Sequence, residues 1–224
     1  LSCTTMDSPM GVLTLVASET GLRAVLWPSD DPARVPLGMV IETADTTEHP
    51  VLTAAVDQLG EYFAGDRQNF DLPLDPVGTD FQQSAWMALR AIPYGETVSY
   101  GEQAAAIGDK RKARAVGAAN GRNPISIVVP CHRVVGSNGS LTGFAGGLDR
   151  KRWLLEHESK TAGHTLPEAT HIVTPGLPKW RPFQRSSDVF WSPFGARVGR
   201  GPKWRSCCLL GASSWSQFLM AGAG

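Results

Sequence analysis

Residues 123–134 read Asn-Pro-Ile-Ser-Ile-Val-Val-Pro-Cys-His-Arg-Val, an apolar, β-branched run that ends abruptly in Pro-Cys-His-Arg. Valine and isoleucine at this density predict a buried strand or extended segment. Pro130 has no backbone N–H and cannot continue a ladder, so we expect Cys131 where the extended run ends. A thiol at that place, followed by the imidazole of His132, indicates a nucleophile. The alternative is a cysteine that only fills space in the core.

Several motifs follow or flank this run in a fixed order. Pro-Cys-His-Arg-Val at 130–134 comes after Asn123-Pro124, and before Gly-Phe-Ala-Gly-Gly at 143–147 and Lys-Arg-Trp-Leu-Leu-Glu-His-Glu at 151–158. This ordered set resembles the methylated-DNA–protein-cysteine methyltransferases, the O6-alkylguanine-DNA alkyltransferases. The resemblance runs from about Met6 to Glu158 and is strongest from Gly78 onward.

The resemblance implies DNA repair by direct, irreversible and stoichiometric transfer of the alkyl group from O6-alkylguanine to Cys131. It implies that His132 takes the thiol proton through a water, that Glu158 orients His132, and that Asn123 braces the turn. Tyr100 is expected to rotate the target phosphate and to donate a proton toward the leaving guanine. The implied partner is double-stranded DNA containing O6-alkylguanine, with no cofactor and a monomeric protein. A relative that binds alkylguanine without transferring the group is the alternative.

The resemblance also implies minor-groove binding and base flipping by the segment 111–120. This segment is basic at its start and otherwise rich in alanine and glycine, and small side chains suit a groove only ~6 Å wide. Arg114 is expected to take the place of the extruded base. The full set of expected DNA-binding residues is Arg114, Tyr100, Ala113, Ala115, Gly117, Ala118 and Asn120. The alkyl pocket is expected to be shaped by Val129, Pro130, Phe144, Ala145 and Gly146.

Two of these pocket positions depart from the family pattern, since Phe144 stands where many relatives have tyrosine and Ala145 where some have serine. The resemblance therefore indicates the type of reaction more firmly than it indicates which alkyl groups the pocket accepts. Arg133 is expected to form a structural ion pair.

Bulk composition narrows the class of protein. The 224 residues carry equal numbers of basic and acidic side chains, so DNA binding must come from a local patch. The four cysteines lack metal-ligand spacing, and their sequence suggests no pairing, which favours a reduced, cytoplasmic protein without a metal. No apolar run approaches the ~20 residues of a membrane helix.

Residues 1–77 predict a small α/β domain, made of a sheet and a helix. Two short apolar runs, 12–17 and 22–27, flank Glu-Thr-Gly and predict a hairpin. A helical repeat follows over 49–63 and ends at Gly65, and residues 70–74 predict a further short strand.

Residues 78–160 predict a mainly α domain. Thr79 is placed to cap one helix, and Ser99 with Glu102 forms a capping box for a second. A turn at Gly108 and a helix over 111–120 complete a helix-turn-helix pattern, although an ordinary helical hairpin has the same signature. A final helix is predicted over 149–157.

Residues 161–224 predict an atypical, irregular tail. Seven basic residues oppose two acidic ones there, and four of the seven tryptophans lie in it, but no helical or strand period is sustained. A tail that binds nucleic acid or a partner, a poorly ordered extension and translation in an altered reading frame all fit this composition.

Three rival functions compete with alkyl transfer. A cysteine hydrolase would use Cys131 and His132, but adjacent residues seldom face the same way and no acyl-binding motif is visible. A metal site at the same pair lacks further ligands. A helix-turn-helix regulator would explain DNA binding but gives no reason for Pro-Cys-His-Arg.

Overall fold

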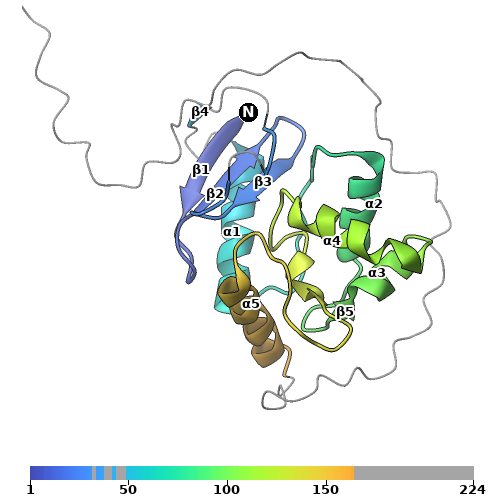
Figure 1. Ribbon diagram of the computed structural model, residues 1–224. Helices are drawn as coiled ribbons and strands as arrows, with labels where there is room; N and C mark the ends of the chain where they lie inside the picture. The colour runs from blue at the N-terminus through green and yellow to red at the C-terminus, as the bar shows by residue number, and fades with distance from the viewer. Residues whose placement is uncertain (32–33, 38–41, 44–48, 164–224) are drawn as a thin grey trace, which may run out of the picture.

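The computed structural model describes residues 1–31, 34–37, 42–43 and 49–163. Figure 1 shows a small sheet backed by a helix in the amino-terminal part and a group of short helices in the carboxy-terminal part. The α/β unit followed by a mainly helical unit confirms the predicted fold class. The predicted tail, 161–224, lies outside the described residues from 164 onward.

The amino-terminal sheet has the strand order β3-β2-β1-β4. Its strands are β1 (Ser2–Met6), β2 (Leu13–Ala17), β3 (Leu22–Leu26) and β4 (Glu42–Thr43). β2 pairs with β1 and β3 in antiparallel fashion, and β4 pairs with β1 in parallel. The predicted hairpin is therefore confirmed as β2 and β3, whereas β1 was not predicted.

Helix α1 (Pro50–Ala64) packs against β1, β2 and β3. Pro50 occupies its first turn, where a missing N–H costs nothing, and Gly65 ends it in the left-handed region at φ 89°. The end at Gly65 agrees with the prediction. The short strand expected at 70–74 is reduced to a single bridge between Leu74 and Leu22.

The carboxy-terminal unit begins with α2 (Asp80–Leu89), which Thr79 caps in a capping box. Ser99 and Glu102 form a second capping box at α3 (Tyr100–Ala106), as predicted. A turn and a short 3-10 helix η2 (Lys110–Lys112) lead into α4 (Ala113–Gly121), which contacts α3. The helix-turn-helix arrangement is confirmed.

The segment before Cys131 is a correction to the prediction. Burial was predicted rightly, but only Ile125 forms a bridge, to Val25, and the chain then turns instead of extending. The N–H of Val129 donates to the carbonyl of Ile125 at 2.9 Å, and Ile127 has φ 73°. A β-branched residue with positive φ is a strained outlier, which tertiary contacts must maintain.

Cys131 lies where this turn ends. Cys131–Arg133 form the 3-10 helix η3, followed by β6 (Val134–Val135), which pairs in parallel with β5 (Val98–Ser99). The last helix, α5 (Leu148–Thr161), is longer at both ends than predicted. It lies beside α1, because His157 Nε2 meets the carbonyl oxygen of Tyr62 at 2.7 Å.

One hydrophobic cluster extends through both units. It joins buried side chains of the sheet and α1 to those around the active segment, including Leu15, Leu59, Leu89, Ile125, Cys131 and Leu154. The two units therefore share a core, and the active segment is packed from both sides. Within the part of the chain that the structure describes, no helix is long and apolar enough to cross a membrane.

Candidate active site

Cys131 is held at the end of a turn that the side chain of Asn123 organises. The Asn123 amide donates to the carbonyl of Val129 at 2.8 Å and accepts from the N–H of Ile125 at 3.1 Å. The N–H of Cys131 in turn donates to the Val129 carbonyl at 2.9 Å. Because these groups are buried, each of these bonds satisfies a backbone atom that water cannot reach. Cys131 itself is 5% exposed.

His132 faces Glu158, a carboxylate from α5. Its Nε2 lies 2.7 Å from Glu158 Oε1, and both side chains are completely buried. An ionised carboxylate only accepts, so Nε2 carries the hydrogen and Nδ1 is left as an acceptor. Nδ1 is buried and has no hydrogen-bond partner among the described residues. The imidazole is therefore oriented with a free basic nitrogen.

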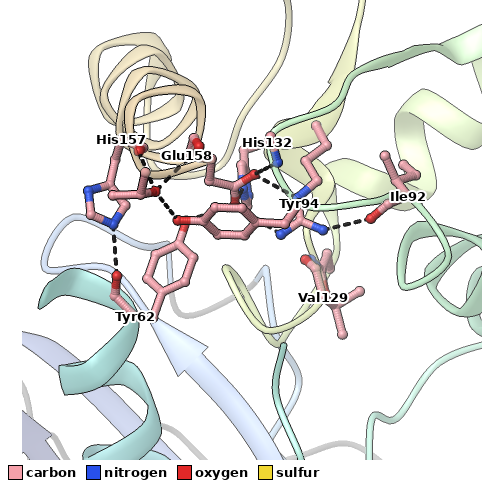
Figure 2. A network of polar contacts seen from close by, with 11 residues as sticks. Tyr62, Ile92, Tyr94, Val129, His132, His157 and Glu158 are labelled. Atoms are coloured by element: carbon pink, nitrogen blue, oxygen red, sulfur yellow. Dashed lines mark hydrogen bonds and ion pairs between the residues drawn. The ribbon is translucent and has the colours of Figure 1, made fainter. Parts of the chain in front are cut away.

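Glu158 also accepts hydrogen bonds from three other residues. Tyr62 donates to Oε1 at 2.8 Å, Arg133 donates to both oxygens at 2.8 and 3.0 Å, and the N–H of Gly95 donates to Oε2 at 3.1 Å. Figure 2 shows the carboxylate between Tyr62 and His132. Burial by itself would raise the pKa of Glu158, but His132 and Arg133 hold it well below its usual value. Arg133 forms the structural pair expected from the sequence.

Cys131 and His132 are both neutral near pH 7. Burial raises the pKa of Cys131, although the Asn123 side chain and the charge of Lys151 oppose the rise. Burial likewise lowers the pKa of His132 below its ordinary 6.5, against the attraction of Glu158. Cys131 thus needs a base to form the thiolate, and His132 is unprotonated and able to act as one.

Lys151 is a second buried charge near Cys131, and no role was predicted for it. Its ammonium donates to the carbonyls of Val134 at 2.5 Å and Thr142 at 2.8 Å. Burial lowers the pKa of Lys151 to about 8, while Cys131 acts in the opposite direction. Lys151 therefore ties the strand after η3 to the loop that precedes α5.

Phe144 connects the predicted pocket loop to the active site. Its ring centroid lies 6.5 Å from that of His132 and 5.8 Å from that of Trp27, edge to face in both cases. Gly146 is buried against Trp27 and Phe144, and a Cβ there would come within 2.8 Å of Trp27. Val129 and Pro130 are buried beside Cys131, and Ala145 is half-buried. The structure thus joins Phe144 and Gly146 to Trp27 beside His132, and the assignment of the alkyl pocket stays a prediction.

Tyr100, the first residue of α3, reaches the same loop. Its hydroxyl donates to the carbonyl of Thr142 at 3.0 Å, and the ammonium of Lys151 lies 5.9 Å from its ring centroid. Burial raises the pKa of Tyr100, and the nearby Cys131 adds to the rise. Tyr100 therefore lies between the helix-turn-helix and the nucleophile.

Helix α4 divides the predicted DNA-binding residues between two faces. The side chains of Arg114, Ala115 and Ala118 are exposed to solvent. Asn120 is only 5% exposed and faces the protein interior. The Asn120 amide donates to Gln103 Oε1 at 2.7 Å, and its carbonyl accepts from Gln103 Nε2 at 3.1 Å. These bonds fix α4 to α3. The DNA-binding role expected of Asn120 stays a prediction; what the structure shows is a buried amide paired with Gln103.

Cys131 is the free cysteine among the described residues. No cluster of three or more histidine, cysteine or acidic side chains lies within the described ranges in a position to hold a metal.

Reasoning from the sequence missed four residues that contact the site. Tyr62, Lys151 and Trp27 lie on core-facing positions, where an apolar pattern predicts packing alone. Arg34 comes from the amino-terminal unit, pairs with Asp30 and donates to the carbonyl of Asn123 at 2.5 Å. The one indication in the sequence was that Tyr62, Lys151 and Trp27 each carry a polar atom at a core-facing position. A buried polar atom needs a hydrogen-bond partner, so each of these residues could have been expected to contact another polar group.

Both units of the chain match known protein families. Residues 1–76 match the ribonuclease-like domain of 6-O-methylguanine DNA methyltransferase, and residues 80–160 match its DNA binding domain. The methylated-DNA–protein-cysteine methyltransferase of Mycolicibacterium paratuberculosis is 51% identical over 168 residues, 72% of this chain and 94% of that protein. The counterpart from Methanosarcina acetivorans is 47% identical, over 68% of this chain and 94% of that one.

A solved structure shows the same fold. The crystal structure of Mycobacterium tuberculosis OGT in complex with DNA has a TM-score of 0.65 and 47% identity, over 72% of this chain and 94% of that one. Family matches to both units, close relatives and a shared fold lead to one conclusion: this chain belongs to the methylated-DNA–protein-cysteine methyltransferase family.

Proposed function

We propose that this chain, as a DNA-repair methyltransferase, removes the alkyl group from O6-alkylguanine in double-stranded DNA by transferring it to Cys131. The observation that carries the proposal is the arrangement of Cys131, His132 and Glu158. A buried free thiol precedes an imidazole whose Nε2 is fixed by a carboxylate and whose Nδ1 is available as an acceptor. This is the order of nucleophile, base and orienting group that activates weak nucleophiles.

In the proposed step, Cys131 Sγ attacks the alkyl carbon in line with the bond to O6 of guanine. The S–C bond forms and the C–O6 bond breaks, and the electron pair of that bond stays on guanine. The thiol proton passes through a water to His132 Nδ1, and guanine receives a proton from the Tyr100 hydroxyl. The atoms balance without a cofactor. Because a thioether is not reopened by this site, each molecule acts once.

DNA would reach the site along the outer face of α4. A base inside a duplex must be flipped out before Cys131 can reach it, which costs a few kcal/mol and less for a damaged pair. Arg114, beside Ala115 and Ala118, would occupy the space that the base leaves. The small side chains of Ala113 and Gly117 would let the helix backbone approach closely. Val129, Pro130, Phe144, Ala145 and Gly146 would enclose the alkyl group.

The division into 1–77, 78–160 and 161–224 is proposed to be one of function as well. The first unit supports the active site through contacts of Arg34, Tyr62 and Trp27 with Asn123, Glu158 and Phe144. The second unit carries the DNA-binding helices and the proposed nucleophile. A monomeric state and a cytoplasmic location stay predictions from the sequence.

Intact-mass spectrometry tests the transfer. The protein is incubated with a duplex oligonucleotide that contains one O6-methylguanine, and Cys131→Ser is treated in parallel. A single mass gain of one methylene, absent in Cys131→Ser and located on Cys131 by peptide mapping, is expected. DNA binding without any mass gain would contradict the proposal and point to a binding-only protein.

A further inference from the structure

Tyr62 brings a hydroxyl from the amino-terminal unit into the active-site network. It lies in the last turn of α1, on the buried face of that helix, and has no exposed surface. Its ring is surrounded by Phe63, Phe70, Tyr94 and His157, with centroids 5.4 to 6.0 Å away. His157 also meets its carbonyl oxygen at 2.7 Å, so the position of this side chain is fixed on several sides.

The Tyr62 hydroxyl and His132 share one oxygen. Oε1 of Glu158 accepts from Tyr62 at 2.8 Å, from His132 Nε2 at 2.7 Å and from Arg133 at 3.0 Å. Figure 2 shows Tyr62 and His132 approaching the carboxylate from different elements. Burial and the charge of Glu158 raise the pKa of Tyr62 well above its usual value, so the phenol stays protonated and acts as a donor.

We propose that Tyr62 is a positioning residue for alkyl transfer: its hydroxyl holds Oε1 of Glu158 in place and shares that oxygen with His132. This inference rests on the proposed function, in which His132 is the base. It gives the amino-terminal unit an indirect part in the chemistry, through the hydrogen bond from Tyr62 to Glu158. Tyr62 contacts neither the thiol nor the alkyl group, so it acts through Glu158 alone.

The shared oxygen makes the basicity of His132 depend on Tyr62. Each donor on Oε1 draws on the negative charge that would otherwise stabilise the imidazolium of His132. The charged groups around His132 are Glu158 and Lys151 from α5 and Arg133 from its own helix, η3. Of these, Glu158 favours the imidazolium and the two cations disfavour it. Removing the Tyr62 hydroxyl therefore strengthens the one favourable partner.

Tyr62→Phe keeps the ring and its contacts and removes only the hydroxyl. Tyr94→Phe is the matched control, because Tyr94 belongs to the same aromatic cluster but its hydroxyl bonds to Thr161 at 2.6 Å instead of to Glu158. Both substitutions delete one buried or half-buried hydroxyl from one cluster. A difference between them therefore reports the contact with Glu158.

The first measurement is the titration of the His132 ring by NMR in the Cys131→Ser background, where no transfer can occur. We expect Tyr62→Phe to raise the midpoint by roughly one pH unit and Tyr94→Phe to leave it unchanged. The inference would be overturned by equal His132 midpoints in the Cys131→Ser protein and in its Tyr62→Phe and Tyr94→Phe derivatives. Equal shifts in the two derivatives would overturn it as well. Ring-fluorinated tyrosine, incorporated in place of the natural residue, makes Tyr62 a stronger donor and is expected to lower the midpoint.

The second measurement is the rate of methyl transfer to Cys131 across acidic and neutral pH. The acid limb of the Tyr62→Phe profile should move to higher pH, with about a tenfold loss of rate below both midpoints and near-normal rates above them. A uniform loss at every pH would mean a merely structural role. Failure of the wild-type protein to transfer would refute the proposed function instead, and the NMR titration would still decide the role of Tyr62.

Discussion

The Asn123 side chain donates to the backbone carbonyl of Val129 across 2.8 Å, and the same carbonyl accepts from the N–H of Cys131 at 2.9 Å. Cys131 is thus positioned by a side chain from the start of the same turn. The bond spans the stretch in which Ile127 adopts φ 73°. Because that backbone conformation is costly for isoleucine, the bonds of Asn123 help to maintain it.

Replacing Asn123 with alanine should loosen this turn. Asn123→Ala leaves the Val129 carbonyl and the Ile125 N–H with fewer partners, and we expect a loss of about 1–3 kcal/mol in the free energy of unfolding. The rate of transfer to Cys131 should fall more than tenfold. Asn138→Ala is the control, since Asn138 also accepts from a backbone N–H two residues on, at 3.2 Å, but on the surface. Chemical denaturation measures the loss of stability, and single-turnover kinetics measure the loss of transfer rate. Equal losses in Asn123→Ala and Asn138→Ala would contradict the prediction.

Glu158→Gln should damage both stability and transfer. The substitution removes the counter-charge of a buried guanidinium, that of Arg133, and such broken pairs typically cost about 3–5 kcal/mol. It also weakens the orientation of His132, so we expect at least roughly a hundredfold slower transfer. Glu156→Gln, on the same helix, should change stability by less than about 0.5 kcal/mol. Wild-type rates in Glu158→Gln would exclude the carboxylate from the mechanism.

Lys151 should make the free energy of unfolding depend on pH in the alkaline range. Its pKa is about 8 when folded and 10.5 ordinarily, so between these values the unfolded chain binds a proton that the folded chain has lost. Linkage then makes stability rise with pH through this window. Lys151→Met should abolish the rise and, at neutral pH, cost ~1–3 kcal/mol because two buried carbonyls lose their donor.

Urea denaturation at both ends of that window checks the prediction. The comparison is made in the Cys131→Ser background, because the raised pKa of Cys131 would contribute a slope of opposite sign. If the free energy of unfolding changes with pH in the same way with Lys151 and with Lys151→Met, the Lys151 ammonium is not the source of the rise.

Gly146→Ala should disturb the pocket loop. The added Cβ would meet Trp27 at 2.8 Å and Phe144 at 2.9 Å, and the overpacking is expected to cost about 1–3 kcal/mol and to slow transfer. Gly60→Ala is the contrasting variant, because no atom lies within 4 Å of the Cβ position there and the residue is inside α1. It should stabilise the protein by about 0.5–1 kcal/mol. Thermal unfolding of both variants decides the matter.

Arg114→Ala should weaken DNA binding without changing the fold. Arg114 lies on α4, and its removal should reduce affinity for duplex DNA and lower the salt dependence of binding, because one cationic side chain leaves the DNA interface. Arg152→Ala, an exposed arginine on α5 that pairs with Asp149, should leave both unchanged. Binding titrations at several salt concentrations provide the test, and equal losses would refute a specific role for α4.

Local patterns in the sequence determined much of the helical part of the fold. The caps at Thr79 and Ser99 and the stop at Gly65 were readable because each depends on residues within one turn of the helix end. The cap predictions succeeded because short-range chemistry dictates the structure at helix ends. The motif around Cys131 predicted a partnership of His132 with Glu158, and the structure brings these two side chains into contact at 2.7 Å, while their roles in transfer stay predictions.

The tertiary structure alone decided the rest. The run of valine and isoleucine before Cys131 became a buried turn, because the bonds of Asn123 outweighed strand propensity. Asn120 faces Gln103, and Tyr62 meets Glu158, through contacts between helices distant in sequence. Burial removes these polar atoms from water, and only the packed chain determines which partner replaces it.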